Sequence, residues 1–167
     1  MELDFARYLR LSRTNFLEVA NQWERPLKRD DLLLNDYLNL VQTLGELMQA
    51  TDTLNPDVPK LLTSQSAAVV DIYGQGLIQF LMISLKQQWT HLMVLEPADL
   101  EKLGKFPQHR LQHQIMGELT MLLNSYHQRR QSDFAHAWRS YLKLGLFELK
   151  LTDVEINQAV ERQLHEA

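Results

Sequence analysis

The sequence predicts an all-α fold, a single domain over residues 1–167 built as a bundle of six or seven helices. Apolar residues recur every three or four positions along most of the chain, which is the spacing of one buried helix face. No segment alternates apolar and polar residues with β-branched enrichment, as a half-buried strand does. The chain of 167 residues also contains only 6 glycines and 5 prolines, so few positions break a helix.

Two amphipathic helices are predicted in the first third of the chain. The first spans residues 3–24 and ends before Pro26, because a proline disfavours helical geometry at the residue that precedes it. Its apolar face comprises Phe5, Tyr8, Leu9, Ser12, Phe16, Val19, Ala20 and Trp23. The second spans residues 32–49, with Asp30 or Asp31 as the expected N-cap. Its apolar face comprises Leu33, Leu34, Tyr37, Leu38, Val41, Leu44 and Met48.

The middle of the chain is predicted to hold a connection and the central helix. Residues 50–59 contain two prolines and are expected to form a loop, after which a third helix runs over residues 59–72. Gly74 and Gly76 follow, and such a pair either breaks a helix or lets a neighbouring element approach closely. The central helix is then expected over residues 77–95.

The last third is predicted to contain further helices, over residues 97–103, 110–130, 132–145 and 152–166. Ser132 is the expected N-cap of the third of these, and Gly145 is expected to end it. In the last one, Thr152 and Glu155 match the capping-box pattern, in which two side chains reciprocally satisfy backbone N–H groups. The core bundle is expected to comprise the helices over residues 3–24, 32–49, 77–95 and 110–130.

Composition excludes several classes of protein. Without cysteine, the chain has neither disulfide bonds nor thiol chemistry. The most apolar segment, residues 72–95, is long enough to cross a bilayer. It contains Gln75, Lys86 and His91, which are costly at membrane depth, so we expect a buried helix and no membrane partner. The first residues lack a basic run followed by an apolar block, so we expect no secretory signal and a cytoplasmic location.

Charge is unevenly distributed along the chain. The net charge is −4, but residues 31–101 carry two basic against nine acidic side chains, and residues 102–131 carry five against one. An acidic centre beside a basic segment fits either a partner-facing dipole or a mosaic of solvated helix faces. Nucleic acid is disfavoured as a partner, because the chain has no long basic stripe and its net charge repels phosphates.

Motifs for catalysis and for metal binding are missing from the sequence, which lowers the expectation of an enzyme. The chain has no glycine-rich phosphate loop, no nucleophile elbow and no zinc-protease motif. His109 and His113 share one helical ridge at i, i+4 spacing, but no third ligand accompanies them. We therefore expect two surface histidines, no metal and no resident cofactor.

A candidate ligand pocket is predicted around Asp71, Tyr73 and His91. Asp71 is an acid within the most apolar third of the chain, and Tyr73 and the two glycines follow it. A buried acid needs a partner or a shifted protonation state, and such groups are frequent at functional sites. His91 stands beside apolar residues and could ligate a haem or pigment. The structural alternatives place Asp71 on an exposed helix edge and His91 at the core boundary.

Two groups of basic residues are candidates for contacting a partner. Their members are Arg110, His127, Arg129 and Arg130 and, on the first helix, Arg7 and Arg10. Neighbouring arginines can hold a carboxylate or phosphate through paired hydrogen bonds. Cations in the last turn of a helix also complement its dipole, so a purely structural role at the surface is the alternative.

Four apolar residues lie off the predicted apolar faces of their helices, namely Leu17, Leu32, Leu47 and Met121. An isologous homodimer would bury them. The sequence therefore favours a non-catalytic regulatory or adaptor protein of bacterial type that binds another protein through its helix faces. The alternative is a helical sensor that holds an apolar ligand or cofactor near Asp71, Tyr73 and His91, and an enzyme is a distant third.

Overall fold

The computed structural model describes residues 1–51, 66–107 and 110–165. These residues form seven α-helices and contain no strand, which confirms the predicted all-α bundle. The helices are α1 (Phe5–Ala20), α2 (Arg29–Ala50), α3 (Ser66–Gln87), α4 (Pro97–Leu103), α5 (Leu111–Gln128), α6 (Gln131–Lys143) and α7 (Asp153–His165). A 3₁₀ turn, η1 (Thr90–Leu92), follows α3, and a π-helical segment, η2 (Leu144–Glu148), continues α6.

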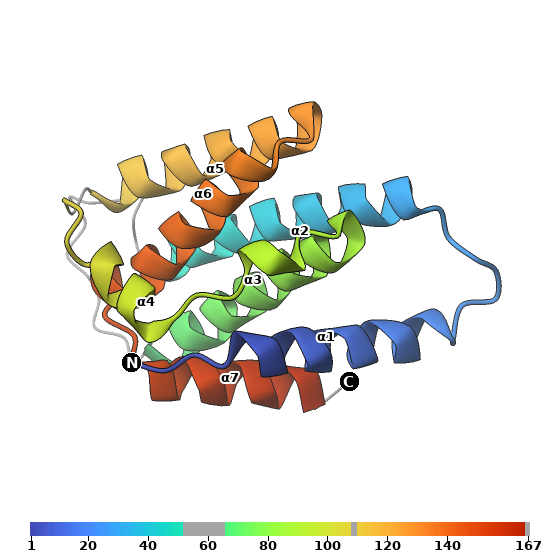
Figure 1. Cartoon of the computed structure of the whole chain (residues 1–167), viewed down its shortest axis with the longest axis horizontal. Coiled ribbons are helices and arrows are strands. Elements are labelled where there is room, and N and C mark those ends of the chain that lie inside the picture. Colours follow the sequence, from blue (N-terminus) through green and yellow to red (C-terminus); the bar gives the residue numbers. More distant parts are fainter. Residues whose placement is uncertain (52–65, 108–109, 166–167) are drawn as a thin grey trace.

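Helix α3 lies at the centre of the bundle (Figure 1). It packs against α1, α2 and α7, and α1 and α7 also lie side by side. Helices α5 and α6 form an antiparallel pair, and α4 contacts α6 near the start of α5. Within the described ranges, no helix has the length and apolar character needed to cross a membrane.

Helix α3 is continuous through Gly74 and Gly76, so of the two expected alternatives it is close packing, and not a break in the helix, that the glycines provide. A Cβ atom at Gly76 would lie 2.2 Å from the hydroxyl oxygen of Tyr141. A Cβ atom at Gly74 would lie 3.2 Å from the Cβ atom of Ala159. The glycines therefore set the approach of α6 and α7 to the central helix.

The central helix ends earlier than the predicted residue 95. It stops at Gln87, because Gln88 adopts a left-handed backbone conformation with a φ of 60°, which an α-helix does not accommodate. The predicted loop and third helix between residues 50 and 72 lie largely outside the described residues, which resume at Ser66.

Two predicted N-caps are wrong. Helix α2 has Lys28 at its N-cap, and Asp30 and Asp31 lie in its first turn, where carboxylates complement the helix dipole. Helix α6 has Arg130 at its N-cap and so begins two residues earlier than an N-cap at Ser132 would give. Neither cap residue makes a side-chain capping hydrogen bond.

The buried face of α2 is rotated relative to the prediction. It comprises Leu33, Tyr37, Leu40, Thr43, Leu44 and Leu47. Leu34 and Leu38, which were expected to be buried, are 38% and 57% exposed. Helix α2 carries leucines around more than half of its circumference, so two overlapping apolar stripes were possible, and contact with α3 selects the one that includes Leu40 and Leu47.

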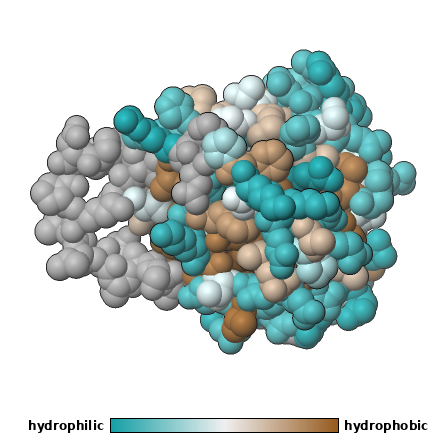
Figure 2. All heavy atoms as spheres, turned by 60° about the vertical axis from the view of Figure 1, so that its left-hand side comes forward, coloured by the Kyte–Doolittle hydropathy of each residue, from teal (hydrophilic) through white to brown (hydrophobic). Residues whose placement is uncertain are grey.

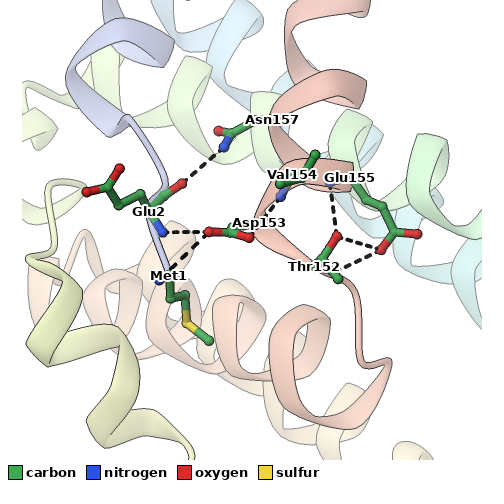
Figure 3. A network of polar contacts seen from close by, with 7 residues as sticks. All are labelled: Met1, Glu2, Thr152, Asp153, Val154, Glu155 and Asn157. Carbon is green, nitrogen blue, oxygen red and sulfur yellow. Dashed lines mark hydrogen bonds and ion pairs between the residues drawn. The ribbon is translucent and has the colours of Figure 1, made fainter.

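Helix α7 begins with the predicted capping box (Figure 3). Thr152 Oγ1 accepts a hydrogen bond from Glu155 N at 3.2 Å, and Glu155 Oε2 accepts one from Thr152 N at 2.9 Å. The same turn holds the segment before α1, because Glu2 N donates to Asp153 Oδ2 at 2.7 Å and Asn157 Nδ2 donates to Glu2 O at 3.0 Å. The hydrogen bond from Glu2 lowers the pKa of Asp153.

Two stacked tyrosines join α3 to α6 in the core. The ring centroids of Tyr73 and Tyr141 lie 4.5 Å apart with an interplanar angle of 4°. Tyr73 donates to the backbone carbonyl of Tyr141 at 2.8 Å, and Tyr141 donates to the carbonyl of Tyr73 at 2.7 Å. A Cβ atom at Gly145 would lie 2.1 Å from Tyr73 Cζ, so this pair, like the contact at Gly76, depends on glycine. Both hydroxyls are buried with satisfied donors, and burial raises the pKa of each tyrosine.

Candidate functional site

The structure does not bring Asp71, Tyr73 and His91 together. Asp71 is exposed on α3 and its carboxylate pairs with Arg162 of α7, as the exposed-edge alternative expected. Tyr73 is fully buried against α6. His91 is exposed on η1, with Nε2 3.1 Å from Gln131 Oε1. The three side chains thus face three different surroundings.

Among the predicted basic contact residues, the structure brings His127 and Arg129 together. They line a recess of about 190 Å³ at the end of α5, which Asp30 also lines. Arg129 Nη2 lies 3.9 Å from Asp30 Oδ1, and Arg130 Nε lies 3.7 Å from Asp133 Oδ2. Each of the two adjacent arginines therefore already faces a carboxylate of the same chain.

The other predicted basic residues lie apart from this recess. Arg7 of α1 pairs with Glu161 of α7, with Nη1 and Oε1 2.7 Å apart. Arg10 is exposed on α1, and Arg110 is exposed immediately before α5. These residues do not form one continuous site with Arg129 and Arg130.

The histidine pair considered for metal binding is only partly described. His113 is exposed on α5, and His109 lies outside the described residues. Across the ranges that the structure describes, no three His, Cys, Asp or Glu side chains form a group that could hold a metal ion.

The four apolar residues expected at a dimer interface lie in different environments. Leu47 is buried in the core, and Met121 packs against the core with part of its side chain. Leu17 is 53% exposed, and Leu32 is partly exposed. Only Leu17 and Leu32 therefore present apolar surface away from the core.

A cavity of about 480 Å³ lies between α4, α5 and α6, a volume typical of small-molecule sites. It is lined by Leu95, Asp99, Lys102, Leu103, Phe106, Pro107, Gln114, Met121, His136, Arg139, Ser140 and Lys143. Figure 2 views the molecule from the side on which α4 lies in Figure 1, and apolar surface there is surrounded by hydrophilic side chains. The sequence did not indicate this site.

The polar end of the cavity is a buried ion pair. Lys143 Nζ lies 2.9 Å from Glu148 Oε1, and the two side chains are only 9% and 4% exposed. Lys143 Nζ also donates to the carbonyl of Pro107 at 2.8 Å, and Gln114 Nε2 donates to Glu148 Oε1 at 3.2 Å. An ammonium has three N–H groups, and among the described residues only these two acceptors are seen. Lys143 also lines the cavity, so its ammonium lies at the cavity wall.

The π-helical segment η2 places the side chain of Glu148 next to that of Lys143. Gly145 was expected to end α6, but the chain continues in η2, where Leu149 N donates to the carbonyl of Leu144 at 2.8 Å. In this wider turn the hydrogen bond spans five residues, so the side chain five positions after Lys143 returns to the same face. Segments of this kind are frequent at functional sites.

Glu118 of α5 is a buried acid beside the cavity. Its residue is 1% exposed, and Oε1 has no hydrogen-bond partner among the described residues. Burial raises the pKa of Glu118 well above its ordinary value, and a hydrogen bond with Ser140 acts in the opposite direction. Ser140 itself lines the cavity. Burial thus favours the neutral form of Glu118, which acts as a hydrogen-bonding group behind the α6 wall.

The two principal walls of the cavity differ in character. Helix α6 contributes a polar wall of His136, Arg139, Ser140 and Lys143, which share one face of that helix. The α4 side is mostly apolar, with Leu95, Leu103 and Phe106. Asp99 is the one acid among the described lining residues, and its Oδ1 lies 3.9 Å from Lys102 Nζ. Among the described residues, Arg139 has no carboxylate within ion-pair distance, so its positive charge is not balanced by an ion pair there.

Glu118 is a sequence signal for this site. Glu118 follows Ile115 by three residues and precedes Leu122 by four, which places an acid in the middle of the apolar face of α5. Lys143 gives no such signal, because it lies on the polar face of α6 and is covered by chain near Pro107. Only the tertiary structure shows that this lysine is buried.

Two buried ionisable residues, Lys143 and Glu118, lie at the cavity or beside it. Lys143 lines the cavity and is held in an ion pair with Glu148. Glu118 is not among the residues that line the cavity, so it does not reach a bound molecule directly. No protein-family model, curated protein or solved structure matches this chain.

Proposed function

We propose that the protein is a non-catalytic regulatory protein that binds a small amphipathic anion in the cavity between α4, α5 and α6. The observation that carries the proposal is one cavity of about 480 Å³ with an apolar wall and a cationic wall that ends at the buried Lys143. Such cavities bury the apolar body of a ligand and use a few polar groups to fix its orientation. The ligand pocket of such a helical sensor would then lie between α4, α5 and α6, and not near Asp71.

The anionic group of the ligand would lie against α6. Arg139 can form paired hydrogen bonds with a carboxylate, and Lys143 offers its ammonium at the floor of the cavity. The apolar body would then contact Leu103, Phe106 and Met121. Each CH₂ group buried there contributes about 0.8 kcal/mol, so affinity should rise with chain length until the cavity is full.

A cytoplasmic location is part of the proposal. The chain contains no cysteine, so it forms no disulfide bond that would require an oxidising compartment. A regulatory protein of this kind would report the concentration of its ligand by binding it preferentially in one conformation.

Isothermal titration calorimetry with decanoate as the probe tests the proposal, with decanol as the uncharged control. Decanoate should bind the wild-type protein at least about tenfold more tightly than decanol, because the anion contacts Arg139 and Lys143. Arg139→Ala should weaken decanoate binding about tenfold and leave decanol binding unchanged. Arg10→Ala, an exposed arginine on α1, is the matched control and should bind as the wild type does.

Three outcomes would contradict the proposal. Equal affinities for decanoate and decanol would show that the cationic wall plays no part in binding. An unchanged decanoate affinity in Arg139→Ala would place the ligand elsewhere. Absence of any heat of binding at millimolar decanoate would remove small amphipathic anions as ligands of the cavity.

A further inference from the structure

A second groove lies at the end of the molecule opposite α4 (Figure 1). It has a volume of about 580 Å³ and is lined by residues of α1, the connection from α1 to α2, the start of α2 and the end of α3. Its floor is aromatic, because the rings of Phe16 and Trp23 meet edge to face with centroids 6.0 Å apart. Leu17 and Leu27 beside them are 53% and 46% exposed. This clustering of exposed apolar side chains distinguishes the groove from an ordinary polar surface.

The charged residues that line the groove are all cations. They are Arg13, Arg29 and Lys86, and no acidic residue is found in the lining within the described part of the chain. Lys86 is neutralised by Asp36, with Nζ and Oδ2 2.5 Å apart, and its ammonium lies 4.5 Å from the centroid of the Phe16 ring. Arg13 and Arg29 have no carboxylate within ion-pair distance among the described residues. The groove therefore presents two uncompensated positive charges beside an apolar floor.

The arginine at the start of α2 is held in place. Arg29 Nη2 donates to the backbone carbonyl of Lys86 and, at 3.4 Å, to Gln87 Oε1. These bonds join the start of α2 to the end of α3 and fix the guanidinium at the edge of the groove. An arginine held in this way loses little further side-chain entropy when an anionic partner binds.

We infer that this groove is the docking site for an amphipathic helix of a partner protein, whose apolar face is flanked by acidic side chains. Apolar anchors at positions i, i+3 or i+4, and i+7 of such a helix would pack on Phe16, Leu17 and Leu27. Glutamate or aspartate next to these anchors would pair with Arg13 and Arg29. The inference does not depend on the ligand proposed for the α4–α5–α6 cavity.

Charge argues against a second copy of this chain as the occupant. An isologous dimer places the same patch of both protomers face to face. Two copies of this groove would set Arg13 and Arg29 of one protomer near the same cations of the other, which is unfavourable when the charges are desolvated. An acidic helix instead neutralises them.

Selection from a phage-displayed library of peptides about 16 residues long tests the inference. The library is selected on the wild-type protein and counter-selected on Leu17→Glu, which changes an exposed side chain and should leave the fold intact by circular dichroism. Enriched peptides should carry apolar residues at helical spacing with an excess of Asp and Glu. Their affinity should fall as salt rises, because the pairs with Arg13 and Arg29 are near the surface.

Synthetic copies of the enriched peptides then map the site. Binding should be at least about tenfold weaker to Leu17→Glu and about fivefold weaker to Arg13→Glu. Leu123→Glu is the matched control, since Leu123 is 49% exposed on α5 and does not line the groove, and it should bind as the wild type does.

Failure to obtain any peptide that distinguishes wild type from Leu17→Glu would overturn the inference, as would enrichment of basic peptides. Sedimentation equilibrium provides a further test. If the wild-type protein forms a dimer that Leu17→Glu converts to a monomer, a second copy occupies the groove and the inference is wrong.

Discussion

Lys143 and Glu148 form an ion pair at 2.9 Å in which both side chains are almost fully buried. Breaking such a pair leaves a buried charge without a partner. Lys143→Met should therefore lower the free energy of unfolding by about 3 kcal/mol. Lys143→Met combined with Glu148→Gln should recover most of this loss, because the double variant buries no charge. Urea denaturation of the wild type, Lys143→Met, Glu148→Gln and the double variant measures the coupling. If the double variant loses as much unfolding free energy as the two single variants together, the pair is not coupled.

The stacked tyrosines make Gly76 intolerant of a side chain. In Gly76→Ala the new Cβ atom meets the Tyr141 hydroxyl, so the free energy of unfolding should fall by about 2 kcal/mol. Gly117→Ala is the matched control, since it lies within α5 and no described atom comes within 4 Å of its added Cβ. There alanine should stabilise the protein by about 0.5 to 1 kcal/mol through its helix propensity. Thermal and urea denaturation give both values, and a similar effect of the two substitutions would argue against the tight contact.

Glu118 should make the stability of the protein depend on pH. Its pKa is raised in the folded protein, so the folded state keeps the proton at pH values where the unfolded chain has already released it. The unfolding free energy of the wild type should therefore fall relative to that of Glu118→Gln as pH rises above the ordinary value of 4.5. The difference grows by about 1.4 kcal/mol per pH unit until the folded-state pKa is reached.

Urea denaturation of both proteins between about pH 4 and pH 8 checks this trend. Glu101→Gln, on the exposed surface of α4, is the matched control. A difference between wild type and Glu118→Gln that stays constant over this pH range would mean that Glu118 ionises as readily in the folded protein as in the unfolded chain.

The capping box of α7 should contribute measurably to stability. Thr152→Ala removes the side-chain acceptor for Glu155 N and should cost about 1 kcal/mol. Val154→Ala, at a side chain that is 58% exposed in the same turn, should change stability by less than about 0.5 kcal/mol. Equal effects in chemical denaturation would show that the reciprocal hydrogen bonds do not persist in solution.

Local signals in the sequence predicted the helices well where one apolar stripe was narrow or a cap was distinctive. The capping box of Thr152 and Glu155 and the short helix that begins at Pro97 appear as expected. Prediction failed where tertiary contact decides between equivalent local choices. Leu34 and Leu40 both lie on apolar stripes of α2, and only packing against α3 shows that Leu40 is the buried one.

The candidate site was less predictable than the fold for a related reason. Lys143 is buried by two features of the structure. The π-helical turn places Glu148 beside it, and the chain near Pro107 covers it. Neither feature has a simple pattern in the sequence. For Asp71 the sequence left burial and an exposed helix edge as alternatives, and the structure shows the exposed edge. Asp71 stands in an apolar stretch of the sequence. Successive side chains of an α-helix point in different directions around its axis, so a residue within such a stretch can still face solvent. Asp71 does so and pairs with Arg162.

The central claim is that a small amphipathic anion occupies the cavity between α4, α5 and α6, and methyl NMR of the methionines tests it most directly. Met121 lines the cavity, whereas Met116 on the same helix is 64% exposed and does not line it. With decanoate added to protein labelled at its methionine methyl groups, we predict saturable shifts of the Met121 methyl and intermolecular NOEs from it to the ligand chain. The Met116 methyl should show neither effect. Ligand NOEs to Met116 with none to Met121 would contradict the claim.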